Sequence, residues 1–133
     1  MSVLLDTHVW LWWLTANSPL TAKERNALDA AAEAGGVCLA AISMWEAQLL
    51  HSKGRLTLPL PFADWLARAT ESRVLTVLPL DREVVVALDA LPARFHGDPA
   101  DRLIVATARV HALLLATRDR AIRRSRTIRL WSA

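Results

Sequence analysis

The feature that most constrains the fold is a regular alternation of short apolar runs with longer segments of helical periodicity. We expect strands at about 2–5, 36–41, 73–80, 113–117 and 127–131. We expect helices at about 7–15, 18–35, 43–54, 62–72, 81–91, 98–112 and 118–125. Strands that alternate with helices favour an α/β protein, here a three-layer α/β/α sandwich with a mostly parallel central sheet. With 133 residues and no repeat or linker, the chain is expected to form a single domain over 1–133.

Composition excludes several classes of protein. Hydrophobic residues make up 53% of the chain and charged residues 22%, which is typical of a compact protein and not of a disordered one. The single cysteine, Cys38, leaves no internal disulfide, and no Cys/His spacing suits zinc. The N-terminus lacks the features of a signal peptide, and its apolar run is interrupted by Asp6 and His8. We therefore expect a cytoplasmic protein with no membrane segment.

Positive charge is concentrated towards the C-terminus. From Arg94 onward, the sequence contains nine arginines and three acidic residues, which gives a net charge of +6. Residues 1–93 carry a net charge of −3. Arginine suits bidentate recognition of phosphate. Two interpretations remain open: a phosphate-rich partner, or an arginine-rich surface that is simply solvated.

Acidic residues follow the ends of three expected strands. Asp6 directly follows the first strand, Glu46 lies one turn into the helix after the second, and Asp119 follows the strand at 113–117. The carboxyl ends of parallel strands share one edge of the sheet, which is where such sheets bind ligands. Asp98 and Asp101 open a helix, and they reach this edge only if the preceding loop places them there.

Each acid also has a purely structural explanation. Asp6 and Asp119 can cap the helices that follow them, and Ser43–Glu46 matches the S-x-x-E capping box. The stretch Asp98–Asp101, with proline at its second position, is a typical helix start. Capping predicts acids scattered over the molecule, however, and does not require that they share one edge.

If the acids converge, their charge must be balanced. Two carboxylates ~4 Å apart repel by ~4 kcal/mol at an effective dielectric constant of about 20. Several can stay ionised together only around a cation, and oxygen ligands without cysteine or histidine select Mg²⁺ or Mn²⁺. Such an ion can bind a phosphodiester, activate water and stabilise the leaving oxygen.

Four sequence blocks carry a resemblance to a known family. They are LLDTHVWLWWL, AAISMWEAQLL, DPADRLIVATA and LLLATRD, in this order and spacing. With them the chain resembles the PIN-domain ribonucleases, and within these the VapC-type toxins of bacterial toxin–antitoxin pairs. The resemblance runs from Val3 to Trp131. It implies a small, usually dimeric α/β sandwich that hydrolyses RNA with Mg²⁺ or Mn²⁺ and is covered by a small antitoxin.

The resemblance also assigns roles to residues. The expected catalytic metal ligands are Asp6, Glu46, Asp101 and Asp119. Residues expected to support them or to orient the substrate are Asp98, Thr117, Thr7 and Arg102. Asp98 is either a helix cap or a residue behind the metal ligands, and Thr117 either orients the site through its hydroxyl or is a small residue that ends a buried strand. Arg102 is either a phosphate contact or one half of a salt bridge. A weaker expectation is that an RNA backbone is bound by Arg118, Arg120, Arg123 and Arg124, for which a solvated helix face is the alternative.

The sequence therefore predicts a metal-dependent endoribonuclease toxin that is neutralised by a cognate antitoxin. The alternative is a catalytically inactive PIN-like domain that binds RNA or protein, although such a binder gains nothing from carboxylates that face phosphate. An acidic-pocket phosphatase would show a D-x-D pair, which Asp6-Thr7-His8 lacks. A receiver-like domain would carry a late lysine, yet the only lysines are Lys23 and Lys53.

Overall fold

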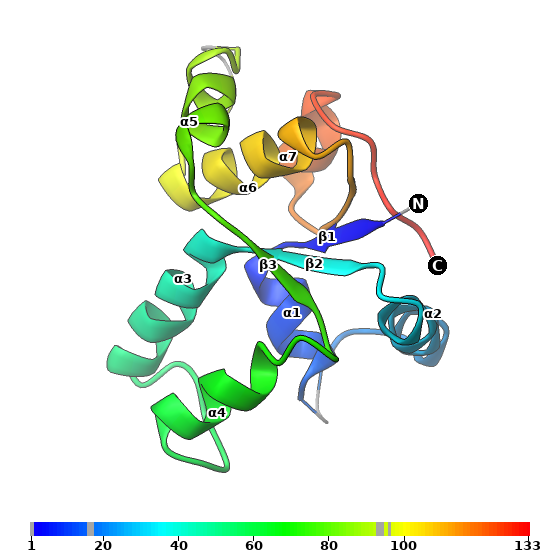
Figure 1. Cartoon of the computed structure of the whole chain (residues 1–133), viewed down its shortest axis with the longest axis vertical. Helices are drawn as coiled ribbons and strands as arrows, with labels where there is room; N and C mark the ends of the chain where they lie inside the picture. Colours follow the sequence, from blue (N-terminus) through cyan, green and yellow to red (C-terminus); the bar gives the residue numbers. More distant parts are fainter. Residues whose placement is uncertain (1, 16–17, 93–94, 96) are drawn as a thin grey trace.

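A parallel four-stranded sheet forms the centre of the computed structural model, which describes residues 2–15, 18–92, 95 and 97–133 (Figure 1). The strands are β1 (Val3–Leu5), β2 (Val37–Ala40), β3 (Thr76–Leu78) and β4 (Leu114–Ala116). Their order is β3-β2-β1-β4, and every pairing is parallel. The chain thus adds β2 and β3 on one side of β1 and then crosses to add β4 on the other. Such a reversal of strand order marks the edge at which ligands bind.

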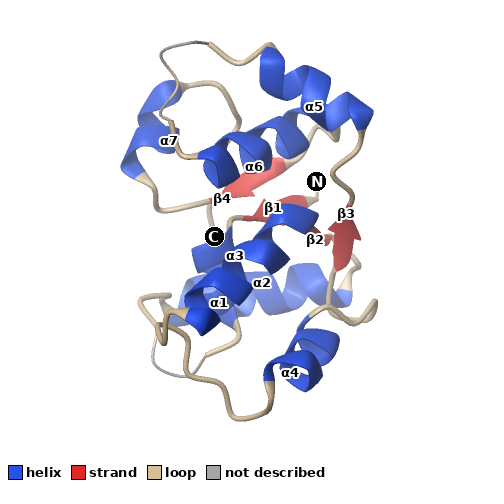
Figure 2. Cartoon of the chain, turned by 90° about the vertical axis from the view of Figure 1, so that its left-hand side faces the viewer, coloured by secondary structure: helices blue, strands red, loops and turns tan. Residues whose placement is uncertain are grey.

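Helices cover both faces of the sheet. They are α1 (Thr7–Trp13), α2 (Ala22–Glu33), α3 (Ala41–Ser52), α4 (Phe62–Ala69), α5 (Arg82–Asp89), α6 (Pro99–Val110) and α7 (Arg120–Ser125). Figures 1 and 2 show α1 to α4 on one side of the sheet and α5 to α7 on the other. The expected three-layer architecture is therefore confirmed. In the described part of the chain, no helix has the length and apolar character that crossing a membrane requires.

Each face of the sheet has its own hydrophobic core. Val3 and Leu5 of β1 pack with Trp10 on the α1–α4 side, whereas Leu4 packs with Ile104 of α6 on the other side. Because neighbouring residues of a strand point to opposite faces, a strand covered on both sides must be apolar throughout. This is why VLL has no polar residue until the strand ends at Asp6.

The structure confirms the expected helix start at Asp98, which caps α6 ahead of Pro99, and contradicts the one at Ser43. Helix α2 begins with a reciprocal capping box between Thr21 and Glu24. Ser43 does not cap α3, because this helix begins at Ala41 and has no side-chain cap. Ser43 is instead a fully buried residue inside the helix.

The expected last strand is reduced to a single bridge. Leu130 forms an isolated parallel bridge with Leu115 of β4. The Leu115 N–H donates to the Arg129 carbonyl at 2.9 Å, and the Trp131 N–H donates to the Leu115 carbonyl at 2.9 Å. The C-terminal segment therefore runs beside β4 without extending the sheet as a regular strand, and it brings Trp131 close to the carboxyl end of β4.

Candidate functional site

Asp6 lies where β1 ends and α1 begins. Its Oδ1 accepts a hydrogen bond of 2.8 Å from the Val9 N–H and so caps α1. The side chain is almost fully buried, and this burial raises the pKa of Asp6. Hydrogen bonds from the Thr117 side chain and the Val9 N–H act in the opposite direction, while the Asp119 carboxylate raises the pKa further. A buried carboxylate with a second one nearby calls for a positive partner.

Thr117 links Asp6 to the carboxyl end of β4. Its hydroxyl donates to Asp6 and accepts a hydrogen bond of 3.0 Å from the Asp119 N–H. Asp119 in turn caps α7, since its Oδ1 accepts from the Ile122 N–H at 2.9 Å. Thr117 is buried, so its hydroxyl has little freedom. It fixes the relative positions of the carboxylates that follow β1 and β4.

Thr7 makes the corresponding link to α3. Its hydroxyl donates to the Glu46 carboxylate and is hydrogen-bonded to the Ser43 hydroxyl at 2.8 Å. Thr7 and Ser43 are both buried, and Glu46 is half-buried. The pKa of Glu46 is raised by burial, lowered by the Thr7 bond, and raised again by the carboxylates of Asp98 and Asp6. Ser43 was expected only as a cap, and the signal that places it here is a small polar residue in an otherwise apolar helix start.

The start of α6 completes the group of acids. Asp98 Oδ1 accepts from the Asp101 N–H at 3.1 Å and caps the helix. The pKa of Asp101 is raised from 3.8 to about 7, first by burial and then by repulsion from the carboxylates of Asp98, Asp119, Glu46 and Asp6. Charges separated in sequence by more than 90 residues therefore act on one carboxyl group.

Capping and convergence occur together in this structure. Asp6, Asp98 and Asp119 each use Oδ1 for a helix N–H. A carboxylate has a second oxygen with further lone pairs, so a capping bond does not consume its ability to bind a cation. The capping explanation is thus correct for these three residues but does not account for their shared location.

The donor set suits a hard divalent cation. The converging groups are all carboxylates, with threonine and serine hydroxyls behind them. Oxygen donors of this kind are the ligands that Mg²⁺ and Mn²⁺ prefer. Among the described residues, no three His, Cys, Asp or Glu side chains stand in an arrangement that encloses an ion.

The arginines expected near the site have varied partners. Arg102 Nη1 donates to the Phe95 carbonyl at 3.1 Å, and its guanidinium lies 5.7 Å from the centre of the Phe95 ring. Arg123 donates to the Thr117 carbonyl at 2.9 Å, and Arg124 donates through Nε to the Arg120 carbonyl at 3.2 Å. Arg102 thus holds the chain that leads into α6, and Arg123 holds the end of β4.

These features are those of a PIN domain, a class of small α/β proteins with acids gathered at one edge of a parallel sheet. The PIN domain family model matches residues 3–127, and the chain belongs to this family. It is similar to the protein named ribonuclease VapC22 of Mycobacterium tuberculosis, with 39% identity over 126 residues, which are 94% of this chain and 92% of the relative.

Solved structures share the fold. A chain of the VapBC2 complex of Rickettsia felis, bound to a promoter DNA fragment, is similar with a TM-score of 0.74 and 15% identity, over 98% of both chains. A chain of FitAcB of Neisseria gonorrhoeae gives a TM-score of 0.71 and 24% identity, over 98% of this chain and 96% of that one.

Proposed function

We propose that this protein is a metal-dependent endoribonuclease toxin, which hydrolyses RNA phosphodiester bonds and is neutralised by a cognate antitoxin. The observation that carries the proposal is that burial, together with the carboxylates of Asp98, Asp119, Glu46 and Asp6, raises the pKa of Asp101 to about 7. The name of the relative at 39% identity supports ribonuclease activity.

Four carboxylates would hold the metal: Asp6, Glu46, Asp101 and Asp119. A bound Mg²⁺ or Mn²⁺ supplies an activated water and neutralises charge that develops on the phosphate. In the reaction a water oxygen bonds to phosphorus and a phosphorus–oxygen ester bond breaks, with no covalent enzyme intermediate. Aspartate and glutamate oxygens suit this chemistry because they hold a hard cation without reacting themselves.

Neighbouring side chains keep these carboxylates in position. Thr7 holds Glu46, and Thr117 holds Asp6 and the backbone of Asp119. Asp98 fixes the first turn of α6 and so aims Asp101 at the other acids. Such supporting hydrogen bonds are typically worth 10- to 100-fold in metal affinity or activity.

The proposed partners follow from the same relatives. We expect an RNA substrate, a cognate antitoxin and a homodimer, acting in the cytoplasm where RNA is available. Structures of similar fold are described as VapBC2 with promoter DNA from Rickettsia felis and as a toxin–antitoxin complex from Klebsiella pneumoniae. These descriptions support an antitoxin partner for this chain.

Cleavage assays on two carboxamide variants test the proposal. Asp6→Asn and Asp101→Asn should each lower RNA cleavage by roughly a hundredfold or more, because several kcal/mol of charge stabilisation are lost. Asparagine caps helices as well as aspartate does, so α1 should remain intact in Asp6→Asn. Asp81→Asn is the matched control, because Asp81 caps α5 through the Val84 N–H and its carboxylate is not one of those that raise the pKa of Asp101.

Chelation separates the enzyme from the inactive alternative. Wild-type cleavage should stop in EDTA and return with Mn²⁺ or Mg²⁺. Full cleavage by both carboxamide variants, in protein free of contaminating nuclease, would contradict the site. RNA binding without cleavage in any divalent ion would favour the catalytically inactive RNA-binding domain.

A further inference from the structure

A basic cavity adjoins the group of acids at the carboxyl end of β4. It has a volume of about 470 Å³, which is within the range of small-ligand sites. Thr117 lines it, and the hydroxyl of this residue also binds Asp6 and the Asp119 N–H. The cavity and the carboxylates therefore meet at one residue. The side chains that give the cavity its chemical character are Glu24, Thr117, Arg118, Arg120, Arg123 and Trp131.

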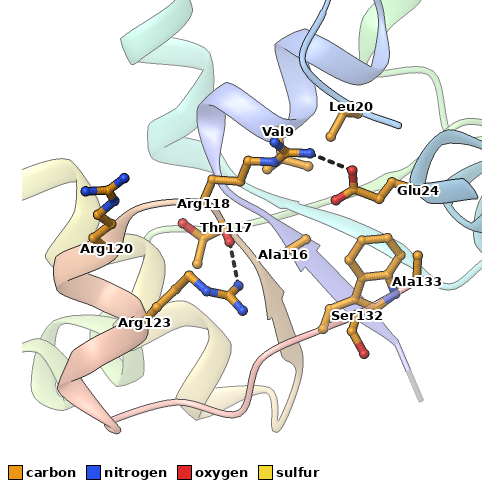
Figure 3. A pocket seen from close by; sticks show the side chains of 11 residues that line it. Val9, Leu20, Glu24, Ala116, Thr117, Arg118, Arg120, Arg123, Ser132 and Ala133 are labelled. Carbon is orange, nitrogen blue, oxygen red and sulfur yellow. Dashed lines mark hydrogen bonds and ion pairs between the residues drawn. The ribbon is translucent and has the colours of Figure 1, made fainter. Parts of the chain in front are cut away.

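The charge of this cavity suits an anion. Three arginines line it against one acid, Glu24, which is already paired with Arg118 at 2.5 Å. Arg118 also donates to the Pro19 carbonyl at 3.1 Å, so two partners hold its side chain in place at the edge of the cavity. Figure 3 shows this pair and the bond from Arg123 to Thr117. Because Arg118 is paired with Glu24, Arg120 and Arg123 are the lining side chains whose positive charge is left for a ligand.

Arg120 and Arg123 are the arginines available to that ligand. Arg123 uses Nη1 for the Thr117 carbonyl, and a guanidinium has four further N–H groups. Arg120 is exposed, and its side chain forms no hydrogen bond or ion pair with the residues that the structure describes. An arginine held beside a cavity without an internal partner is well placed to bind a phosphate group.

The cavity also has an apolar part, which includes an aromatic ring. Trp131 lines the same cavity, together with the apolar side chains of Val9, Leu20 and Ala116. Its backbone is bonded to Leu115 of β4, which fixes the residue beside the sheet. A cavity with arginines and an indole accommodates both parts of a nucleotide, the phosphate on the arginines and the base on the ring.

We propose that this cavity binds one unpaired nucleotide of a single-stranded RNA next to the cleaved bond, with its phosphate on Arg120 and Arg123 and its base on Trp131. The proposal rests on the proposed function for the presence of RNA. Stacking on an indole requires an exposed base face, which a base inside a duplex does not offer. The protein therefore selects single-stranded over double-stranded RNA.

Binding without cleavage tests the proposal separately from catalysis. Wild-type protein in EDTA is titrated against a fluorescein-labelled single-stranded hexaribonucleotide, and binding is followed by anisotropy. Arg120→Gln should weaken binding about 5- to 20-fold and reduce the slope of log Kd against log salt by about 0.7, the value for one phosphate contact on a single strand. A duplex of the same sequence should bind at least about tenfold more weakly than the single strand.

Arg82→Gln is the matched control. Arg82 is likewise exposed, but it begins α5 and does not line this cavity. This variant removes the same charge, so its affinity should stay within about twofold of wild type if position matters more than net charge.

The stacking contact is tested by two further variants. Trp131→Phe keeps an aromatic face and should bind within about threefold of wild type, whereas Trp131→Leu should lose about tenfold or more. Because Trp131 also packs against the core, thermal unfolding of both variants is measured alongside, and the Arg120 comparison stands whatever the result.

Three outcomes would overturn the proposal. The first is an equal loss of affinity in Arg120→Gln and Arg82→Gln, and the second is equal affinity for duplex and single strand. The third is a weakened antitoxin complex of Arg120→Gln with RNA affinity unchanged, which would make the cavity a protein-docking site. Failure of the nuclease assignment would give a different result from these three: RNA would bind as described, but no divalent ion would restore cleavage.

Discussion

The Thr7 hydroxyl donates a hydrogen bond to the Glu46 carboxylate and thereby joins the first residue of α1 to the middle of α3. These residues are 39 positions apart, and they lie in the helices that follow the parallel strands β1 and β2. The bond sets the orientation of one proposed ligand relative to Asp6, the residue before Thr7. It is a relationship that neither helix creates alone.

Replacing Thr7 tests whether this orientation matters. Thr7→Val keeps the shape but loses the hydroxyl, and we expect cleavage to fall about 10- to 100-fold with a higher Mn²⁺ requirement. Thr7→Ser restores the hydroxyl and should recover most of the activity. RNA cleavage rates over a Mn²⁺ titration provide the measurement.

Thr107→Val is the control for loss of a buried hydroxyl. Thr107 is equally buried, but its hydroxyl donates to the Leu103 carbonyl of its own helix at 2.7 Å. This variant should cleave RNA as wild type does. If Thr7→Val and Thr107→Val have the same activity and Mn²⁺ requirement, Thr7 has no role in orienting Glu46.

Asp101 should make the metal-free protein less stable as pH rises. Its pKa is about 7 in the folded chain and 3.8 as the ordinary value, so between these values the folded chain retains a proton that the unfolded chain has released. The free energy of unfolding therefore falls as pH rises from about 4 to about 7. Asp101→Asn removes this dependence and should raise stability at pH 8 in EDTA by about 1 kcal/mol, allowing for solvent screening, or roughly 3–5 °C in Tm.

Thermal unfolding at pH 5 and pH 8, with and without Mn²⁺, measures this effect. Added Mn²⁺ should stabilise wild type most at the higher pH, where it does not compete with a proton, and should stabilise Asp101→Asn little. Wild-type stability that rises between pH 5 and pH 7 in EDTA would contradict the raised pKa of Asp101.

Asp98 should act as a helix cap and not as a metal ligand. Asp98→Ala removes the bond to the Asp101 N–H and should lower the free energy of unfolding by about 1 kcal/mol. Asp98→Ser replaces the carboxylate with another good cap and should retain both stability and most of the cleavage activity. Denaturant unfolding and RNA cleavage are measured together. A loss of activity in Asp98→Ser as large as that of Asp101→Asn would make Asp98 a ligand.

The layered fold could be predicted because local signals agree with it. VLL of β1 reads as a strand buried on both faces, and the structure places Val3 and Leu4 in different cores. The capping residue Asp98 marks the start of α6 as expected. In these segments the local sequence pattern and the tertiary packing favour the same structure.

Other features depend on contacts that no local pattern specifies. The spacing of Ser43 and Glu46 suits a capping box, but it also places two residues on one face of a continuous helix. The choice between a capping box and a continuous helix depends on Thr7, which lies 36 residues before Ser43 and binds both side chains. Likewise, Asp101 reaches the other acids because of how α6 packs on the sheet, and Trp131 lines the basic cavity because the C-terminal segment runs beside β4.

The central claim is that acids from four parts of the chain bind a divalent ion together. The most direct measurement is an anomalous difference map from crystals of the wild-type protein grown with Mn²⁺. We predict a peak about 2.1 Å from carboxylate oxygens of Asp6 and Asp101, with Glu46 and Asp119 bound directly or through water. A map with no peak among these carboxylates at saturating Mn²⁺, or with manganese bound only elsewhere on the protein, would contradict it.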